Sequence, residues 1–224
     1  MERNIKVTGT GRMAVTPDQI EVTISATGKY QDYEETVSHS AADTGVLRES
    51  VQAAGLDPKD LKTTYFNVDT DYERFTDENG HWREKFCGYS YSHTLSITIP
   101  RDNGILGRLL YQLANCAVRT EFSFRHTVSD PKAAKNELLA RAIADSREKA
   151  QIIAREADLK LGVIQTVDYS WQQMQIYSEP MLLADGEGAA PMSGAFMSKR
   201  TMDIDIEAAD INIEDTVTIV WAVE

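Results

Sequence analysis

Hydrophobic and polar residues alternate along several stretches of the chain, which is the two-residue period of a half-buried strand. The stretch from Ile20 to Thr27 shows this alternation first. In the clearest case, Cys87 to Ile99, tyrosine, histidine, leucine and isoleucine fall on one face and serine and threonine on the other. Leu61 to Tyr72 precedes it as a partner strand, and Thr76 to Gly80 forms the turn. The pattern predicts an antiparallel hairpin whose Ser/Thr face is open to water or to another subunit.

Apolar residues at helical spacing predict three main helices between the strands. Asp32 is placed to open the first helix, and Asp102 to open a short second one. The third and longest helix begins at Pro131, continues to about Asp158, and carries many alanines on its inner face. Small side chains let a helix lie close to a sheet. We therefore predict an α+β fold, with three main helices packed on antiparallel or mixed sheets.

Shorter alternating stretches complete the predicted sheets. Arg119 to Val128 and Gly162 to Trp171 are expected to be strands. Two closing strands are expected at Met202 to Ile206 and Val217 to Val223, with a turn around residues 209–214 between them.

The length of 224 residues suits a single domain over residues 1–224. Both halves place strands around a helix, so two related lobes, about 1–128 and 129–224, are an alternative arrangement. Residues 172–199 lose all periodicity and gather Met, Ala, Gly and Pro. A connection of this length is expected to be a long loop or a partly disordered segment.

The charge balance excludes one class of partners. Thirty-five acidic residues face 23 basic ones, for a formal net charge of −12, and no basic stripe compensates. Nucleic acids and anionic lipid surfaces need a basic counterpart, so neither is expected as a partner. No apolar run approaches the ~18 residues of a membrane span, and membrane insertion is not predicted.

No leader is visible at the N-terminus, and a cytoplasmic location is therefore expected. The alternative is a periplasmic or exported protein from which a leader was removed. Cys87 and Cys116 are the only cysteines, and packed thiols are their expected state. A disulfide between them would require export.

Two candidate sites have simpler structural interpretations. Gly9 to Ala14 fits the glycine pattern of a dinucleotide-binding loop, but Pro17 and a strand follow where a helix is needed. The glycines are therefore expected in a turn between two strands. Asp77, Glu78, His81 and Glu84 match no metal motif and are expected in a solvated turn.

The remaining histidines give no site either. His39 is expected in solvent, whereas His93 and His126 lie on apolar strand faces, where a hydrogen-bonded histidine is the usual outcome. No catalytic, metal-binding or cofactor-binding residue is assigned, no cofactor is predicted, and enzymatic activity is not favoured. The segment after residue 170 holds more apolar residues than a solvated linker needs, which suggests either a loop that folds back over its own core or a contact surface for another subunit. The candidate partner-contact residues there are Trp171, Tyr177, Met181, Leu182, Leu183 and Phe196.

Several short motifs occur in the order and spacing of a known family. They are Val7-Thr8-Gly9-Thr10-Gly11, Val15-Thr16-Pro17-Asp18, Gly55-Leu56, Asp60 to Thr63, Gly88-Tyr89, Phe122-Ser123-Phe124, the run Ala140 to Ala150, and Leu161-Gly162. Together they resemble the SIMPL-domain proteins over nearly the whole chain. Two departures are the missing export signal and Ser146, which stands where alanine is usual.

The resemblance implies an architecture and a class of behaviour. SIMPL members include periplasmic immunogenic proteins, some of which form large rings, and a mammalian adaptor that binds a pelle-like kinase. Some bacterial members are associated with oxidative-stress tolerance. The resemblance supplies no catalytic residue.

These observations favour a non-enzymatic binding or assembly protein that self-associates and has a stress-related role. The expected interfaces are the Ser/Thr sheet face or residues 172–199. One alternative is a small-ligand carrier or enzyme with a pocket between the lobes, near His93 or His126. Another is an adaptor for a different protein.

Overall fold

A computed structural model describes residues 3–76, 80–169, 176–178 and 207–224. The chain folds as two compact units. The first is built on residues up to 18, 127–178 and 208–224, and the second on residues 19–126. The units are not consecutive in the sequence, because the first strand pairs with the last one.

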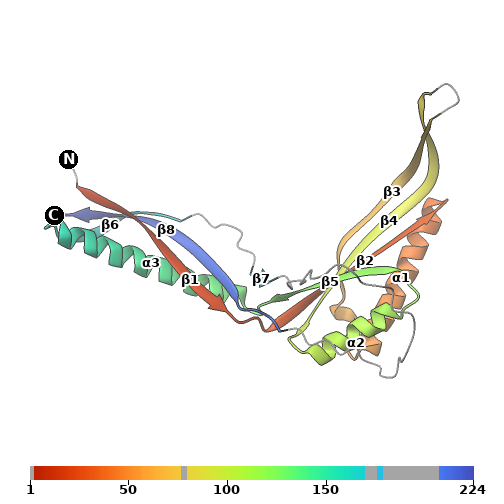
Figure 1. Cartoon of the computed structure of the whole chain (residues 1–224), viewed down its shortest axis with the longest axis horizontal. Helices are drawn as coiled ribbons and strands as arrows, with labels where there is room; N and C mark the ends of the chain where they lie inside the picture. Colours follow the sequence, from red (N-terminus) through yellow and green to blue (C-terminus); the bar gives the residue numbers. More distant parts are fainter. Residues whose placement is uncertain (1–2, 77–79, 170–175, 179–206) are drawn as a thin grey trace, which may run out of the picture. The chain divides into compact units, whose positions relative to one another are not determined.

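In the first unit, a helix packs on one face of an antiparallel sheet with strand order β1-β8-β6 (Figure 1). The predicted long helix is confirmed and begins at a proline, after an aspartate whose side chain accepts a hydrogen bond from Ala133 N. The elements are β1 (Asn4–Val15), α3 (Pro131–Glu156), β6 (Leu161–Asp168), the short β7 (Tyr177–Ser178) and β8 (Ile211–Val223).

Helix α3 lies unusually close to β1. A Cβ atom built on Gly9 would stand 2.0 Å from the carbonyl oxygen of Ala142, and one on Gly11 would stand 2.1 Å from that of Leu138. Both glycines lie inside β1, so the prediction that they form a turn is wrong. Their role is to remove side chains that would separate the strand from the helix.

Three side chains of α3 also bond to the backbone of β1. Asp145 Oδ2 accepts from Thr10 N at 2.7 Å, Lys149 donates to the carbonyl of Thr8 at 3.3 Å, and Arg141 donates to that of Arg12 at 3.1 Å. Because β1 is an edge strand, these bonds satisfy groups that would otherwise attract another strand.

In the second unit, α1 and α2 cover one face of an antiparallel sheet whose strand order is β3-β4-β2-β5 (Figure 1). The core joins the inward residues of β2 and β4 to the leucines of α2. The elements are β2 (Gln19–Tyr30), α1 (Tyr33–Ala53), the 3-10 turn η1 (Pro58–Asp60), β3 (Lys62–Thr76), β4 (Trp82–Pro100), α2 (Asn103–Ala114) and β5 (Thr120–Thr127).

The predicted α+β class is confirmed for the described residues, which hold three α-helices on two antiparallel sheets. The alternation along β4 is confirmed too, since Tyr91, His93 and Leu95 are buried and the intervening serine and threonine residues are only partly covered. One boundary is corrected, because β8 already begins at Ile211, inside the predicted turn. The strand expected at 202–206 lies outside the described residues.

The close approach of α3 to β1 predicts a large effect of one methyl group. Gly9→Ala should lower the free energy of unfolding by more than ~3 kcal/mol, because the clash is with backbone atoms. Gly45→Ala is the matched control, since nothing lies within 4 Å of the added Cβ on α1. It should raise stability by about 0.5–1 kcal/mol. Urea denaturation followed by circular dichroism measures both, and a Gly9→Ala protein of wild-type stability would contradict the packing.

Candidate functional site

The hairpin of β3 and β4 extends beyond the rest of its sheet. Strand β2 ends at Tyr30, opposite Tyr89 of β4, whereas β3 continues to Thr76 and β4 begins at Trp82. Residues 71–76 and 82–88 therefore form a two-stranded ribbon, here called the arm, which projects past β2 and α1 (Figure 1). Neither α1 nor α2 covers the arm, although both cover the rest of this sheet on one face.

A β-bulge at the base of the arm decides which side chains face which way. Asp71 pairs with Gly88 and Tyr72 with Phe86, so Cys87 is the extra residue. Gly88 has φ +113°, and a Cβ there would stand 2.2 Å from the carbonyl oxygen of Tyr30. The extra residue turns Phe86 onto the face of Tyr89, whereas strict alternation would put it on the opposite face.

Aromatic rings line this face in a continuous series. Tyr33 contacts Tyr89 edge-on at a centroid distance of 5.6 Å, Tyr89 contacts Phe86 at 5.3 Å, and Phe86 contacts Tyr72 at 5.7 Å. Trp82 lies farther along the same face by alternation, and it is 76% exposed. These five residues are called the aromatic stripe, and all except the half-covered Tyr89 are exposed.

Polar contacts hold the arm between these rings. Arg74 and Glu84 pair across the strands at 2.8 Å, and with Trp82 and Arg83 they line a surface pocket of about 680 Å³. Lys29 binds Asp71 at 2.7 Å where β2 ends, and this hydrogen bond raises the pKa of the lysine. The arm therefore offers an apolar stripe beside charged groups, an arrangement typical of protein-binding surfaces.

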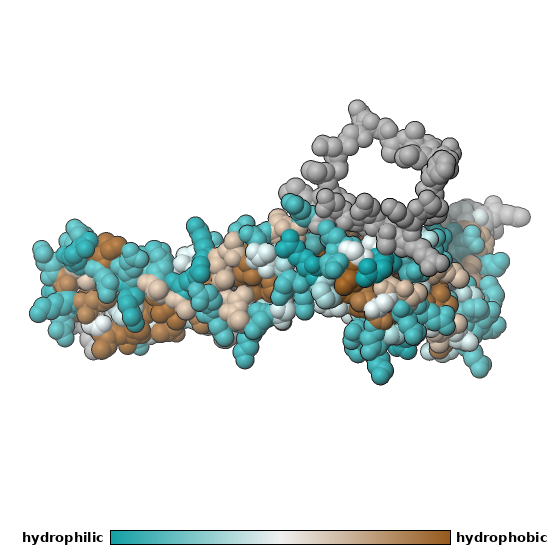
Figure 2. Space-filling model, turned by 90° about the horizontal axis from the view of Figure 1, so that it is seen from below, coloured by the Kyte–Doolittle hydropathy of each residue, from teal (hydrophilic) through white to brown (hydrophobic). Residues whose placement is uncertain are grey.

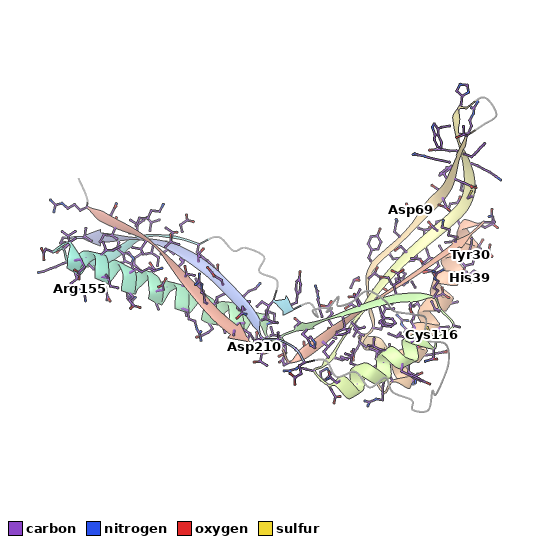
Figure 3. All side chains as sticks on the ribbon, in the orientation of Figure 1. Tyr30, His39, Asp69, Cys116, Arg155 and Asp210 are labelled. Carbon is purple, nitrogen blue, oxygen red and sulfur yellow. The ribbon has the colours of Figure 1, made fainter. Side chains whose placement is uncertain are left out.

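The stripe is anchored where α1 begins. Tyr30 stacks on His39 of α1 with a centroid distance of 4.1 Å and an interplanar angle of 2° (Figure 3). One turn further along α1, Asp43 accepts a hydrogen bond from the buried hydroxyl of Tyr91, and burial together with this bond raises the pKa of the tyrosine. These contacts fix α1 against β2 and β4, and so fix the position of Tyr33.

Only one of the predicted contact residues can be placed. Tyr177 is half-buried in β7, directly after Ile176, which belongs to a core cluster of the first unit. The other predicted contact residues, Trp171, Met181, Leu182, Leu183 and Phe196, lie outside the described residues. Sequence reasoning missed the arm, although four aromatic residues within six positions of the predicted turn were a usable signal.

The two strand histidines differ in their surroundings. His93 is buried and bonds through both ring nitrogens, to Thr44 at 3.1 Å and to Thr63 at 2.9 Å. His126 is 1% exposed, and neither of its nitrogens has a hydrogen-bond partner among the described residues. The expectation of a hydrogen-bonded histidine is therefore met by His93 and wrong for His126.

Neither a metal site nor a disulfide occurs among the described residues. The described part of the chain brings together no group of three or more His, Cys, Asp or Glu side chains that could hold a metal ion. Cys87 and Cys116 are free thiols, each near a backbone carbonyl. None of the described helices combines the length and the hydropathy that a membrane span requires.

A family model described as SIMPL, a protein of unknown function (DUF541), matches residues 5–221. The chain belongs to the SIMPL family. It is 28% identical to the 26 kDa periplasmic immunogenic protein of Brucella melitensis biotype 1, over 193 residues that cover 85% of this chain and 74% of the relative. The protein of the same name from Brucella abortus (strain S19) is 27% identical, with the same coverage.

This SIMPL chain exposes a second apolar surface on its first unit. Figure 2 shows brown hydrophobic patches among teal residues at the end that carries the chain termini. The exposed aliphatic residues of the unit lie on α3 and on the edge strand β6, and they are Ile152, Ile153, Val163, Ile164 and Val167. Strand β6 meets β8 with two register shifts, which makes it an irregular edge for pairing.

The buried His126 predicts a loss of stability in acid. Burial and then the charge of Arg101 lower the pKa of His126 below the usual 6.5. Below pH ~6.5, this histidine is therefore more readily protonated in the unfolded chain than in the folded protein. Neutral His126 therefore makes its full contribution to the free energy of unfolding above pH ~6.5. This contribution declines as the pH falls below that value. His126→Leu should therefore gain about 1 kcal/mol relative to wild type between pH 8 and pH 5.5, measured by urea denaturation. Parallel pH profiles for the two proteins would refute this assignment.

Proposed function

We propose that this SIMPL protein is a non-enzymatic binding and assembly protein, and that the arm docks on a second copy of the chain. The observation that carries the proposal is the aromatic stripe, exposed on a ribbon of only two strands. An isolated two-stranded ribbon is marginally stable in water at best. A partner that covers the stripe would stabilise the arm and bury rings of the kind that dominate binding energies.

A second copy suits the arm because both copies can present the same edge of β3 to each other. Two β3 edges that pair antiparallel about a two-fold axis keep the aromatic stripes of both copies on the same side of the joined sheet, next to each other. Aromatic pairs across neighbouring strands are favourable. Strand β3 is the outer strand of its sheet, which leaves this edge available for pairing.

Other functions find less support. A carrier or enzyme built around the strand histidines would need polar groups that converge on a deep pocket, whereas His93 already bonds to threonine hydroxyls on both sides. An adaptor for a different protein would use the same stripe and differ only in its partner. The proposed location is the periplasm, because the two similar Brucella proteins carry that location in their names. A role in oxidative stress stays a proposal that rests on the family resemblance.

The proposal predicts that polar substitutions on the stripe weaken assembly. Wild-type protein should sediment as an oligomer, and Trp82→Ser/Phe86→Ser should raise its dissociation constant at least about tenfold, because both substitutions remove exposed aromatic surface. Analytical ultracentrifugation over a wide range of protein concentrations provides the measurement.

The control is Tyr65→Ser, which removes an exposed ring from the opposite face of β3 and should leave the mass of the oligomer unchanged. Circular dichroism would establish that all variants are folded. The proposal would be wrong if the wild-type protein stays monomeric at high concentration, or if the double variant forms oligomers of the wild-type mass.

A further inference from the structure

A cationic pocket lies where α1, η1 and the start of β3 meet, away from the arm. Its volume is about 470 Å³, within the range of small-molecule sites. Three positively charged side chains, one hydroxyl group and two apolar side chains line it. They are Arg48, Lys59, Lys62, Thr63, Pro58 and Leu61.

The three cations have no anionic partner in the described part of the chain. Neither a salt bridge nor a side-chain hydrogen bond to another described residue engages Arg48, Lys59 or Lys62. The carboxylate of the nearby Asp57 accepts from the backbone N–H of Lys59 at 2.9 Å, and Asp60 also lies on η1. Neither carboxylate forms a salt bridge with these three cations among the described residues. Three unpaired cations around one pocket are notable in a chain whose net charge is −12. Their summed field favours a negatively charged ligand.

Thr63 connects this pocket to the buried His93. The hydroxyl of Thr44 donates to the carbonyl of Ser40 at 2.8 Å, so its oxygen accepts from the Nδ1–H of His93 at 3.1 Å, and the hydroxyl of Ser40 lies 3.4 Å from the same nitrogen. The neutral imidazole then carries no proton on Nε2, which accepts from the hydroxyl of Thr63 at 2.9 Å. While His93 is neutral, the hydroxyl of Thr63 therefore donates its hydrogen bond to His93 and cannot donate it into the pocket.

Protonation of His93 would reverse this last hydrogen bond. Nε2–H would donate to Thr63, and the threonine proton would be free to point into the pocket. An anion in the pocket would accept a hydrogen bond from that hydroxyl and would interact favourably with the new charge on the imidazolium. Ligand binding and His93 protonation should therefore reinforce each other, as linkage between two binding events requires.

We propose that this pocket binds a small organic anion, a carboxylate or phosphate group on a compact apolar body, and that Thr63 couples its occupancy to His93. Arg48 and Lys62 hold the charged group, and Lys59 adds to the positive field. Pro58 and Leu61 contact the apolar body. The site is independent of the arm and of self-association, so either proposal can fail without the other.

The charges around His93 set the direction of the coupling. Arg48 of α1 acts on His93 through its charge, and Lys62 of β3 lines the same pocket as Arg48. Asp43 of α1 accepts a hydrogen bond from the hydroxyl of Tyr91 on β4. Burial and then the charge of Arg48 lower the pKa of His93. An anion beside Arg48 opposes that charge and raises the pKa again. Affinity should therefore increase as the pH falls below the usual 6.5 of histidine.

The full chain can be titrated with benzoate, phenyl phosphate and the neutral benzyl alcohol, with binding followed by NMR. Benzoate should saturate the pocket, about tenfold more tightly at pH 5.5 than at pH 8, and it should raise the titration midpoint of the His93 ring. Benzyl alcohol should not saturate. The tighter of the two anions at pH 8 identifies the head group as carboxylate or phosphate.

Variants test the residues one at a time. Arg48→Gln and Lys62→Gln should each weaken benzoate about fivefold, whereas Lys132→Gln on α3, the control for lost charge, should not change the affinity. Thr63→Val should keep the affinity at pH 8 and reduce its increase at pH 5.5, because only the attraction of the anion to the imidazolium charge then remains. The proposal is overturned if benzoate binds equally well without Arg48 and Lys62, or if the ring of His93 titrates identically with and without benzoate.

Discussion

Helix α3 lies directly on the backbone of β1, because glycines at positions 9 and 11 put no side chain between them. At this separation, Arg141, Asp145 and Lys149 reach around the strand and bond to its outer backbone groups. One close contact therefore builds the first unit and closes one edge of its sheet. It also gives a physical reason for two of the motifs on which the resemblance to the SIMPL proteins rests, Val7 to Gly11 and the run Ala140 to Ala150.

In the second unit, the helices stop short of the end of the sheet. Helix α1 begins at Tyr33, close to the end of β2, and both lie at the base of the arm. Past this point, the face that is buried under α1 continues as exposed aromatic rings. The bulge at Cys87 keeps Phe86 on that face. The apolar face of the core therefore continues along the arm, where it is exposed to solvent. The proposed docking function depends on this continuity.

The sequence was sufficient for patterns that depend on neighbouring residues, such as the alternation of β4 and the start of α3 at Pro131. The sequence was insufficient where a residue's role depends on a contact with a residue far away along the chain. The glycines of β1 are explained by Ala142 and Leu138, more than 100 positions away, and pattern alone favoured a turn. The bulge hid the stripe for a similar reason, because strict alternation assigns Phe86 to the serine face. Of the predicted contact residues, only Tyr177 can be placed, and it lies half-buried in the first unit.

Hydrogen–deuterium exchange of the arm at increasing protein concentration tests the central claim most directly. If a second copy covers the arm, the amides of residues 71–76 and 82–88 should exchange more slowly as the oligomer forms, while those of the β2 core stay unchanged. Exchange in the arm that is equally fast at every concentration, in a protein that nonetheless oligomerises, would contradict the account.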